Sequence, residues 1–407
     1  LIHPTPVDVP DWADRGVAWL IAAQHQDGGW GAGSQAAQQI KDPHAVQTDP
    51  ATTAFAALAL LRVGNTASSG PQAPALARAL AYLATAVETA PAEGGSITAL
   101  RGTQIQGKLG PMIDTAMTAQ ALARALPTFA SEDPLRARVD AALSVCLERL
   151  QRSQQVEGHW GGGGWAPVLQ AATACSALEL AQASGKTVDP DVLARARDWQ
   201  KGNVRAPTTS IAPGAEGAVV DRAGTEAMSA GVQLYAYSGG QRANAAEASA
   251  ARALVDAAKK DGRLAADAPV DAVSLAKMVS PERAKELAAA VVQSDDQARR
   301  VIGDEQLLAG FGNNGGEEYL SYLMTTESLI IDRGESYDQW MAKMRTRLPK
   351  AQNQDGSWSG HHCITSPVFC TAAVVQVAAA EAEAPYLRRV AALAAKVEAK
   401  PAGVAAP

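Results

Sequence analysis

Apolar side chains recur along most of this chain at intervals of three and four residues, the spacing that places them on one face of an α-helix. Residues 51–62 and 135–152 follow this pattern, and both stretches contain many good helix formers. Strict alternation of apolar and polar residues, which would predict β-strands, is almost absent. Glycine- and proline-rich stretches separate the helical patterns and predict turns. The chain is therefore predicted to be all-α.

One spacing occurs three times: Leu, three residues, Gln, three residues, Gly, any residue, Trp. Leu and Gln four residues apart share a helix face. The acidic residue and Gly that follow favour a turn in which a positive φ costs little. The Trp can then fold back over the end of a helix. Three copies predict a repeated helix-turn unit; they are Leu20-Gln24-Gly28-Trp30, Leu150-Gln154-Gly158-Trp160 and Leu348-Gln352-Gly356-Trp358.

A second helix, rich in Ala and Thr on all sides, follows each turn and suits a crowded inner position. Six outer–inner pairs are predicted to begin near residues 12 and 50, 74 and 113, 135 and 167, 190 and 225, 244 and 317, and 337 and 367. Six tandem helical hairpins that close on themselves form an (α/α)6 toroid; an open helical solenoid is the alternative. The toroid is predicted as a single domain over residues 10–385 with a helical insertion at about 262–312, followed by a C-terminal helix and tail at 386–407.

The segment from Arg15 to Leu20, followed by Gln24 and Gly28-Gly29-Trp30, resembles the QW motif of the terpene cyclase and protein prenyltransferase superfamily. The later copies resemble it less fully, because an arginine (Arg149 or Arg347) replaces the aromatic residue before Leu. The resemblance implies an α/α toroid with a central cavity. It also implies that sites gather at the mouth, where the inner helices begin.

Departures from the known families limit what the resemblance implies about chemistry. The Asp-x-Asp-Asp acid of class II cyclases is absent, and Asp295-Asp296 in Ser-Asp-Asp-Gln does not match it. Aromatic residues make up only 5% of the chain, which leaves few faces to stabilise carbocations. The Asp-x-Cys zinc ligands of prenyltransferase β subunits are also absent. The Cys-His-Gly of lanthionine cyclases is replaced by His361-His362-Cys363.

The segment from Gly360 to Cys370 holds two imidazoles and two thiols at the predicted start of the sixth inner helix. Its candidate metal ligands are His361, His362, Cys363 and Cys370. Such ligands suit Zn or Cu, and a helix N-terminus lowers the pKa of a nearby thiol. The segment therefore predicts a Zn or Cu site. A Cys363–Cys370 disulfide and buried, inert thiols are the alternatives.

Acidic residues at helix starts are the candidate catalytic groups: Glu317, Glu318 and Asp114. Glu317 and Glu318 open the fifth inner helix. Because packed helices lie ~8–10 Å apart, these carboxylates are placed to face the His/Cys segment as ligand or general base. Asp114 holds the position in its repeat that Cys370 holds in the sixth. Each of the three has a structural alternative, since a carboxylate stabilises a helix N-terminus.

Composition excludes several classes of protein. The chain has 407 residues, 47% of them hydrophobic and 19% charged, which is typical of a globular protein. The net charge is -6 and no long basic run occurs, so nucleic acid is not an expected partner. No apolar run approaches the ~18 residues of a membrane helix. The chain opens with Leu1 and not Met, which favours a processed, exported or periplasmic protein.

Three hypotheses of function follow. The first is a metal-dependent enzyme with a His/Cys site at the mouth of the toroid, acting on an apolar or peptide substrate without a nucleotide cofactor. The second is a non-catalytic toroid that binds a lipid, peptide or protein partner. In that case the four cysteines, including Cys146 and Cys175 of the third pair, form disulfides. The third is a divergent terpene cyclase that uses an unrecognised carboxylic acid.

Overall fold

The structure is a computed structural model that describes residues 7–161, 163–202, 233–312, 314–334 and 336–395. Within these residues it contains α-helices and short 3-10 helices, and its β-structure is limited to one bridge between Ser34 and Thr103. The all-α prediction is confirmed.

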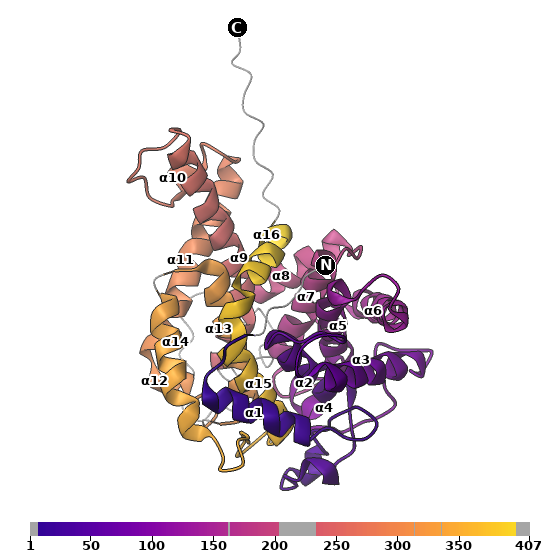
Figure 1. Ribbon diagram of the computed structural model, residues 1–407. Coiled ribbons are helices and arrows are strands. Elements are labelled where there is room, and N and C mark those ends of the chain that lie inside the picture. Colours follow the sequence, from indigo (N-terminus) through magenta and orange to yellow (C-terminus); the bar gives the residue numbers. More distant parts are fainter. Residues whose placement is uncertain (1–6, 162, 203–232, 313, 335, 396–407) are drawn as a thin grey trace.

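In the described part of the chain, six long helices form an outer layer and six form an inner layer (Figure 1). The outer helices are α1 (Asp11–Ala22), α3 (Ala73–Glu88), α6 (Pro134–Ser153), α8 (Pro190–Gly202), α11 (Pro281–Gly303) and α14 (Ser336–Arg347). The inner helices are α2 (Pro50–Arg62), α5 (Ile113–Ala125), α7 (Pro167–Ala183), α9 (Gln233–Lys260), α13 (Gly316–Asp332) and α15 (Pro367–Ala379). Shorter helices complete the fold: α4 (Gln104–Leu109), α10 (Ala272–Leu275), α12 (Glu305–Leu308) and α16 (Ala384–Ala395).

The inner helices form a closed ring. Each one packs against the next in the order α2, α5, α7, α9, α13 and α15, and α15 packs against α2. All thirteen residues of α2 are buried, as its Ala- and Thr-rich sequence requires. Nearly all residues of α5 and α13 are buried as well. The exceptions are Gln120, Met324 and Glu327, and all three line the central lumen. The (α/α)6 toroid is confirmed, and the open solenoid is wrong.

The three QW turns fold alike. In each, the Trp indole N–H donates to the carbonyl of the motif Leu at 2.8 Å. The turn glycines Gly28, Gly158 and Gly356 have φ of 89°, 99° and 93°. A Cβ on Gly28 or Gly158 would collide with the backbone of the next outer helix. Glycine is therefore required for both the turn and the close approach.

The motif glutamines join neighbouring repeats. Each donates to the carbonyl of its own turn glycine and to a carbonyl in the first turn of another outer helix. A net contribution of about 1 kcal/mol is expected from each such bond. The second bond of the last motif reaches the first outer helix and so helps to close the ring; the acceptors are Ala75 for Gln24, Val192 for Gln154 and Trp12 for Gln352.

The fifth pair differs from prediction. The outer helix expected near residue 244 does not begin there, because Asn244 lies in the middle of α9. Gly239 lies inside the same helix and touches Val168 of α7, so its small size serves close packing. The end of α9, α10 and the start of α11 form an arm with its own apolar core that projects from the ring (Figure 1). The inner helix expected near residue 225 lies outside the described residues.

One helical stretch, Pro367–Leu393, is apolar and long enough to cross a membrane. Of its most apolar window, 78% is buried inside the protein. This burial is expected, because the stretch comprises the inner helix α15 and α16, which packs on α7, α9 and α13.

Candidate functional site

Glu318 is a fully buried capping residue at the start of α13. Its Oε1 accepts from the Tyr235 hydroxyl at 2.5 Å and from the Phe311 N–H at 2.9 Å. Its Oε2 accepts from the Gly315 N–H at 2.8 Å and lies 3.9 Å from His362 Nε2. Three hydrogen-bond donors therefore satisfy this carboxyl group. Glu318 has a structural role at the start of α13, and it also lies close to His362.

Glu317, its neighbour in sequence, is equally buried but poorly satisfied. Its Oε2 accepts from the Ile364 N–H at 3.1 Å, whereas Oε1 has no hydrogen-bond partner among the described residues. Burial, and then the charge of Glu318, raise the pKa of Glu317 to about 8. At neutral pH, Glu317 is therefore a protonated carboxylic acid, and its Oε1 has no hydrogen-bond partner among the described residues.

The thiols near α15 are not thiolates. Burial, and then Glu317, raise the pKa of Cys363 to about 12, and they also raise the pKa of Cys370. Cys370 is fully buried, with Sγ 3.8 Å from the Ile364 carbonyl. The lowered thiol pKa expected from the helix N-terminus is wrong, because desolvation and a nearby carboxylate outweigh the helix dipole.

The predicted metal ligands are only partly brought together. His361 is exposed, whereas Cys363 and Cys370 are buried in the rim. Among the described residues, no group of three or more His, Cys, Asp and Glu side chains is arranged to hold a metal ion. The Zn or Cu site stays a prediction without support from this geometry. All four cysteines are free, so neither expected disulfide is formed.

A row of ring contacts runs from His362, which lies beside Glu318, through Phe311 to Trp165. The His362 ring meets Phe311 edge to face at 5.3 Å between centroids, and Phe311 meets Trp165 at 6.2 Å. Lys108 Nζ lies 5.8 Å from the centre of the Trp165 ring. Within the described structure, both nitrogens of the His362 ring and the Trp165 indole nitrogen are buried without a hydrogen-bond partner. His362 lies beside Glu318, and its unsatisfied nitrogens mark a place for a polar ligand group or water.

Asp114 lies elsewhere on the rim. It is fully buried and accepts from the Ala51 N–H at 3.2 Å and from Gln106 Nε2 at 2.8 Å. It acts on Asp49, the N-cap of α2: burial, and then Asp114, raise the pKa of Asp49 to about 7. Asp114 and Asp49 thus form a pair of carboxyl groups that connects the starts of α2 and α5. This agrees with the prediction that Asp114 stabilises a helix N-terminus.

No sequence motif marks Tyr235, Lys108, Phe311 or Trp165 as a site residue. Each lies outside a motif and reaches the rim from a different part of the chain. Among these residues, Trp165 alone carried a usable signal, since it follows the four glycines that begin at Gly161.

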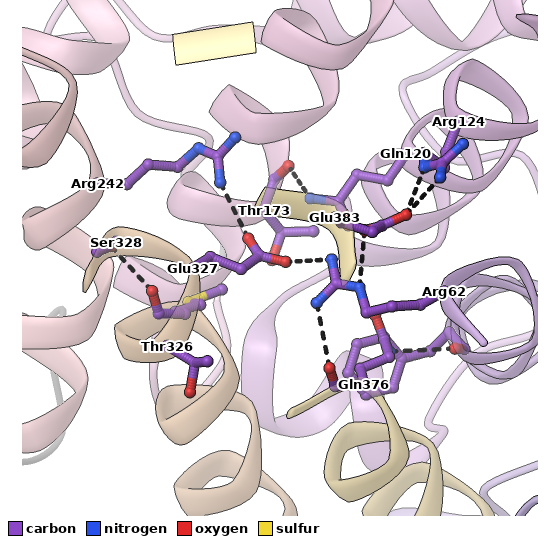
Figure 2. A network of polar contacts seen from close by, with 12 residues as sticks. Arg62, Gln120, Arg124, Thr173, Arg242, Thr326, Glu327, Ser328, Gln376 and Glu383 are labelled. Carbon is purple, nitrogen blue, oxygen red and sulfur yellow. Dashed lines mark hydrogen bonds and ion pairs between the residues drawn. The ribbon is translucent and has the colours of Figure 1, made fainter. Parts of the chain in front are cut away.

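The lumen at the centre of the ring contains a cavity of about 50 Å³. Side chains from all six inner helices line it, among them Phe55, Leu58 and Met117. Charged side chains also line the wall, and they pair with one another as Figure 2 shows. Arg62 bonds Glu327 and Glu383 at 2.5 and 2.9 Å. The described lumen is therefore largely filled by its own side chains.

Comparisons with known proteins relate the first hairpin to one family. Residues 6–94 match the family model of the squalene-hopene cyclase C-terminal domain. This segment contains the first QW turn and the helices α1 to α3. A search of curated proteins gives no match.

One solved structure has a similar fold over most of this chain. An inactive variant of the alpha-1,6-mannanase GH76A of Salegentibacter sp. HEL1_6, in complex with alpha-1,6-mannotetrose, matches with a TM-score of 0.53 and 11% identity. The match covers 92% of this chain and all of the mannanase chain. The type II terpene cyclase MstE from Scytonema matches with a TM-score of 0.35 and 14% identity, over 92% of this chain and 97% of its own.

Proposed function

We propose that this α/α toroid is a terpene cyclase-like, acid–base enzyme in which Glu317 protonates an apolar substrate that carries an epoxide. The observation that supports this proposal is the state of Glu317: a fully buried carboxyl with a pKa of about 8 and one oxygen without a described partner. A carboxyl that stays neutral at pH 7 can serve as a general acid. Glu317 would serve as the proton donor in place of the missing Asp-x-Asp-Asp motif, although it lies at a different position in the sequence.

An epoxide suits this acid better than a simple alkene. A carboxylic acid with a raised pKa is weak, and it gives its proton more readily to oxygen than to carbon. The Glu317 O–H breaks, an O–H forms on the epoxide, and the epoxide C–O bond breaks to leave a carbocation. A substrate alkene then attacks the cation, and loss of a C–H proton to the Glu317 carboxylate restores the acid.

The surroundings support this chemistry. The Ile364 N–H stabilises the Glu317 carboxylate that forms on proton transfer. Trp165 and Phe311 offer ring faces or edges near the site, and a ring face attracts a developing cation. Phe311 is 45% exposed, so the substrate would reach Glu317 by displacing Phe311 and His362.

A non-catalytic binding toroid is the second candidate. The observation that favours it is the small lumen, because about 50 Å³ cannot hold a polyprenyl chain in the described conformation. Under this candidate, an apolar ligand or peptide binds at the rim and leaves unchanged.

The test is incubation with a panel of C15 to C30 polyprenyl epoxides, with products identified by gas chromatography and mass spectrometry. We expect Glu317→Gln to lower the turnover rate at least about 100-fold, since it keeps the shape and removes the acidic proton. The rate should also fall above about pH 8, where Glu317 ionises. Glu157→Gln, at an exposed position of a QW turn, is the matched control and should keep the wild-type rate.

Two outcomes overturn the proposal. A Glu317→Gln variant as active as the wild type would remove Glu317 from the reaction. Binding of the epoxides without turnover, at any pH from 5 to 9, would favour the binding toroid.

A further inference from the structure

A second cavity, of about 210 Å³, lies between two loops at the end of the toroid where the inner helices begin. One wall is the strap, which we define as residues 33–47 between the first QW turn and α2. The other wall is residues 100–103, just before α4. No described residue of its lining belongs to the lumen or to the region around Glu317. The cavity is therefore a separate candidate site.

Hydrogen bonds fix the two walls of this cavity. Ser34 and Thr103 form the β-bridge that joins the walls along one edge, through backbone hydrogen bonds of 2.8 and 2.9 Å. The strap is also held from outside, because Gln38 Nε2 donates to the Cys363 carbonyl at 2.7 Å. The Thr365 hydroxyl donates to the Gln38 carbonyl at 2.6 Å. The cavity is therefore preformed, so that little ordering of the chain is needed for a ligand to bind.

Most side chains of the lining are aliphatic; they are Ala37, Ile40, Ala45, Val46 and Leu100. Water finds few hydrogen bonds between such walls, whereas an alkyl chain gains by leaving water for them. Ile40 is partly exposed, so the cavity can be reached from solvent. An apolar cavity of about 150 Å³ holds a benzene molecule. In proportion, this larger cavity suits an aliphatic chain of roughly six to eight carbon atoms.

One charged side chain lines the cavity, that of Arg101. Its Nη1 donates to the carbonyls of Thr98 and Leu100, which are neutral groups. Within the described part of the chain, no carboxylate forms an ion pair with Arg101. The buried Asp114 carboxyl bonds to other donors, and burial raises its pKa although Arg101 acts to lower it. The guanidinium group of Arg101 therefore has its charge and further N–H donors available to a carboxylate.

We propose that this cavity binds a short aliphatic carboxylate of about six to eight carbon atoms. Its chain lies between the strap and residues 100–103, and its carboxylate binds Arg101. Water gains little from the aliphatic walls, and an inorganic anion leaves them uncovered. The chain supplies most of the affinity, because Arg101 is exposed and exposed ion pairs are weak. The charge sets the preference for an acid over an alcohol or an amine. The site does not depend on the reaction proposed for Glu317.

The first test measures the affinity of the wild-type chain for unbranched carboxylates from butanoate to decanoate, by ligand-observed NMR. We expect the affinity to increase about fourfold with each added methylene until the cavity is filled, and then to level off. Octanol and octylammonium should bind up to about fivefold more weakly than octanoate. Affinities that do not depend on chain length, or equal affinities for octanoate and octylammonium, would overturn the proposal.

Methyl NMR spectra of the wild-type chain locate the ligand. Octanoate should shift the methyl signals of Ile40, Val46 and Leu100, which line the cavity. It should leave Leu58, which lines the lumen, unchanged. Shifts confined to methyl groups outside the strap and residues 100–103 would contradict the site, even if octanoate binds.

The matched variants are Ala37→Leu and Ala36→Leu. The two alanines are adjacent in the same 3-10 helix, but only Ala37 lines the cavity. Ala37→Leu fills part of the space and should weaken octanoate binding at least about tenfold, since room for two or more methylenes is lost. Ala36→Leu should leave the affinity unchanged. Equal octanoate affinities in the two variants would count against the cavity.

Arg101→Gln tests the charge while it leaves the aliphatic walls in place. It should remove the preference for octanoate over octanol, because the remaining amide is neutral. Arg299→Gln, at an exposed position of α11, is the control and should keep that preference. An Arg101→Gln variant that still prefers octanoate would show that Arg101 does not bind the carboxylate.

Discussion

The rim and the lumen of this toroid both bury glutamates, yet they give them opposite charge states. Burial and the adjacent Glu318 raise the pKa of Glu317 to about 8. Glu383 is also buried, but Arg62 and Arg124 outweigh the burial and hold its pKa below the usual value. Burial alone therefore does not decide the charge of a carboxyl. The charge depends on whether a guanidinium group bonds to the carboxyl. Without one, the carboxyl stays protonated like Glu317; with one, it ionises like Glu383.

The largest expected difference between the two regions concerns stability. Glu383→Gln leaves Arg62 and Arg124 without their shared charge inside the protein. We expect the free energy of unfolding, from urea denaturation at pH 7, to fall by about 3–5 kcal/mol. Glu88→Gln, which breaks an exposed pair with Arg138, is the control and should cost about 0–1 kcal/mol. Equal effects of the two variants would mean that the lumen network does not stabilise the fold.

The second prediction concerns the pH dependence of Glu317. Below pH 4.5 this carboxyl is protonated in both the folded and the unfolded chain. Between pH 4.5 and about 8 only the unfolded chain ionises, so wild-type stability falls by up to about 1.4 kcal/mol per pH unit. Above pH 8 this loss is complete. Urea denaturation at pH 6 and pH 8 should therefore show that the stability of Glu317→Gln, relative to the wild type, rises by about 2 kcal/mol over that interval.

For Glu383→Gln, the same experiment should show a change in relative stability with pH of the opposite sign. Its folded-state pKa lies below the usual value, so the ion pairs lose their contribution as the pH falls. The cost of Glu383→Gln should therefore shrink in acid. Stability curves of Glu317→Gln and wild type that stay parallel from pH 5 to 8 would show that Glu317 is ionised, and the comparison would fail.

The smallest expected effect concerns the thiols of the rim, which should react very slowly with alkylating reagents. A Cys363 pKa of about 12 leaves very little thiolate at pH 8, so iodoacetamide should modify Cys363 and Cys370 slowly in the folded protein. All four thiols should react in denaturant. Because no three potential ligands among the described residues are arranged to hold a metal ion, elemental analysis should give well below one metal per chain. Rapid labelling of Cys363, or stoichiometric metal, would restore the site that the sequence predicts.

The repeated parts of the fold could be predicted from the sequence. Three matching spacings place Trp30, Trp160 and Trp358 on the carbonyls of their motif leucines, with the same 2.8 Å bond in each case. These contacts join residues ten positions apart, so a local pattern contains the information. The fifth pair could not be predicted in this way, because the Ala-rich sequence around Asn244 continues a helix as readily as it starts one.

The candidate site was only partly predictable. Glu317, Glu318, His362 and Cys363 do lie together, as the order of the inner helices implied. Their chemistry was not predictable, since it depends on desolvation and on Tyr235, which lies 83 positions before Glu318. The ion pairs of the lumen could not be predicted for the same reason. Arg62 and Glu383 are separated by most of the chain and meet only when the ring is closed.

Closure of the ring also affects how the chain reaches its native state. The last QW glutamine binds a carbonyl 340 positions earlier in sequence, and α15 packs on α2. During synthesis the first hairpin therefore emerges long before the hairpin that covers its outer flank. An open repeat array adds units one by one to a stable end, but this ring exposes two apolar flanks until the sixth hairpin arrives. Folding is expected to be slow and to finish in one late, cooperative step.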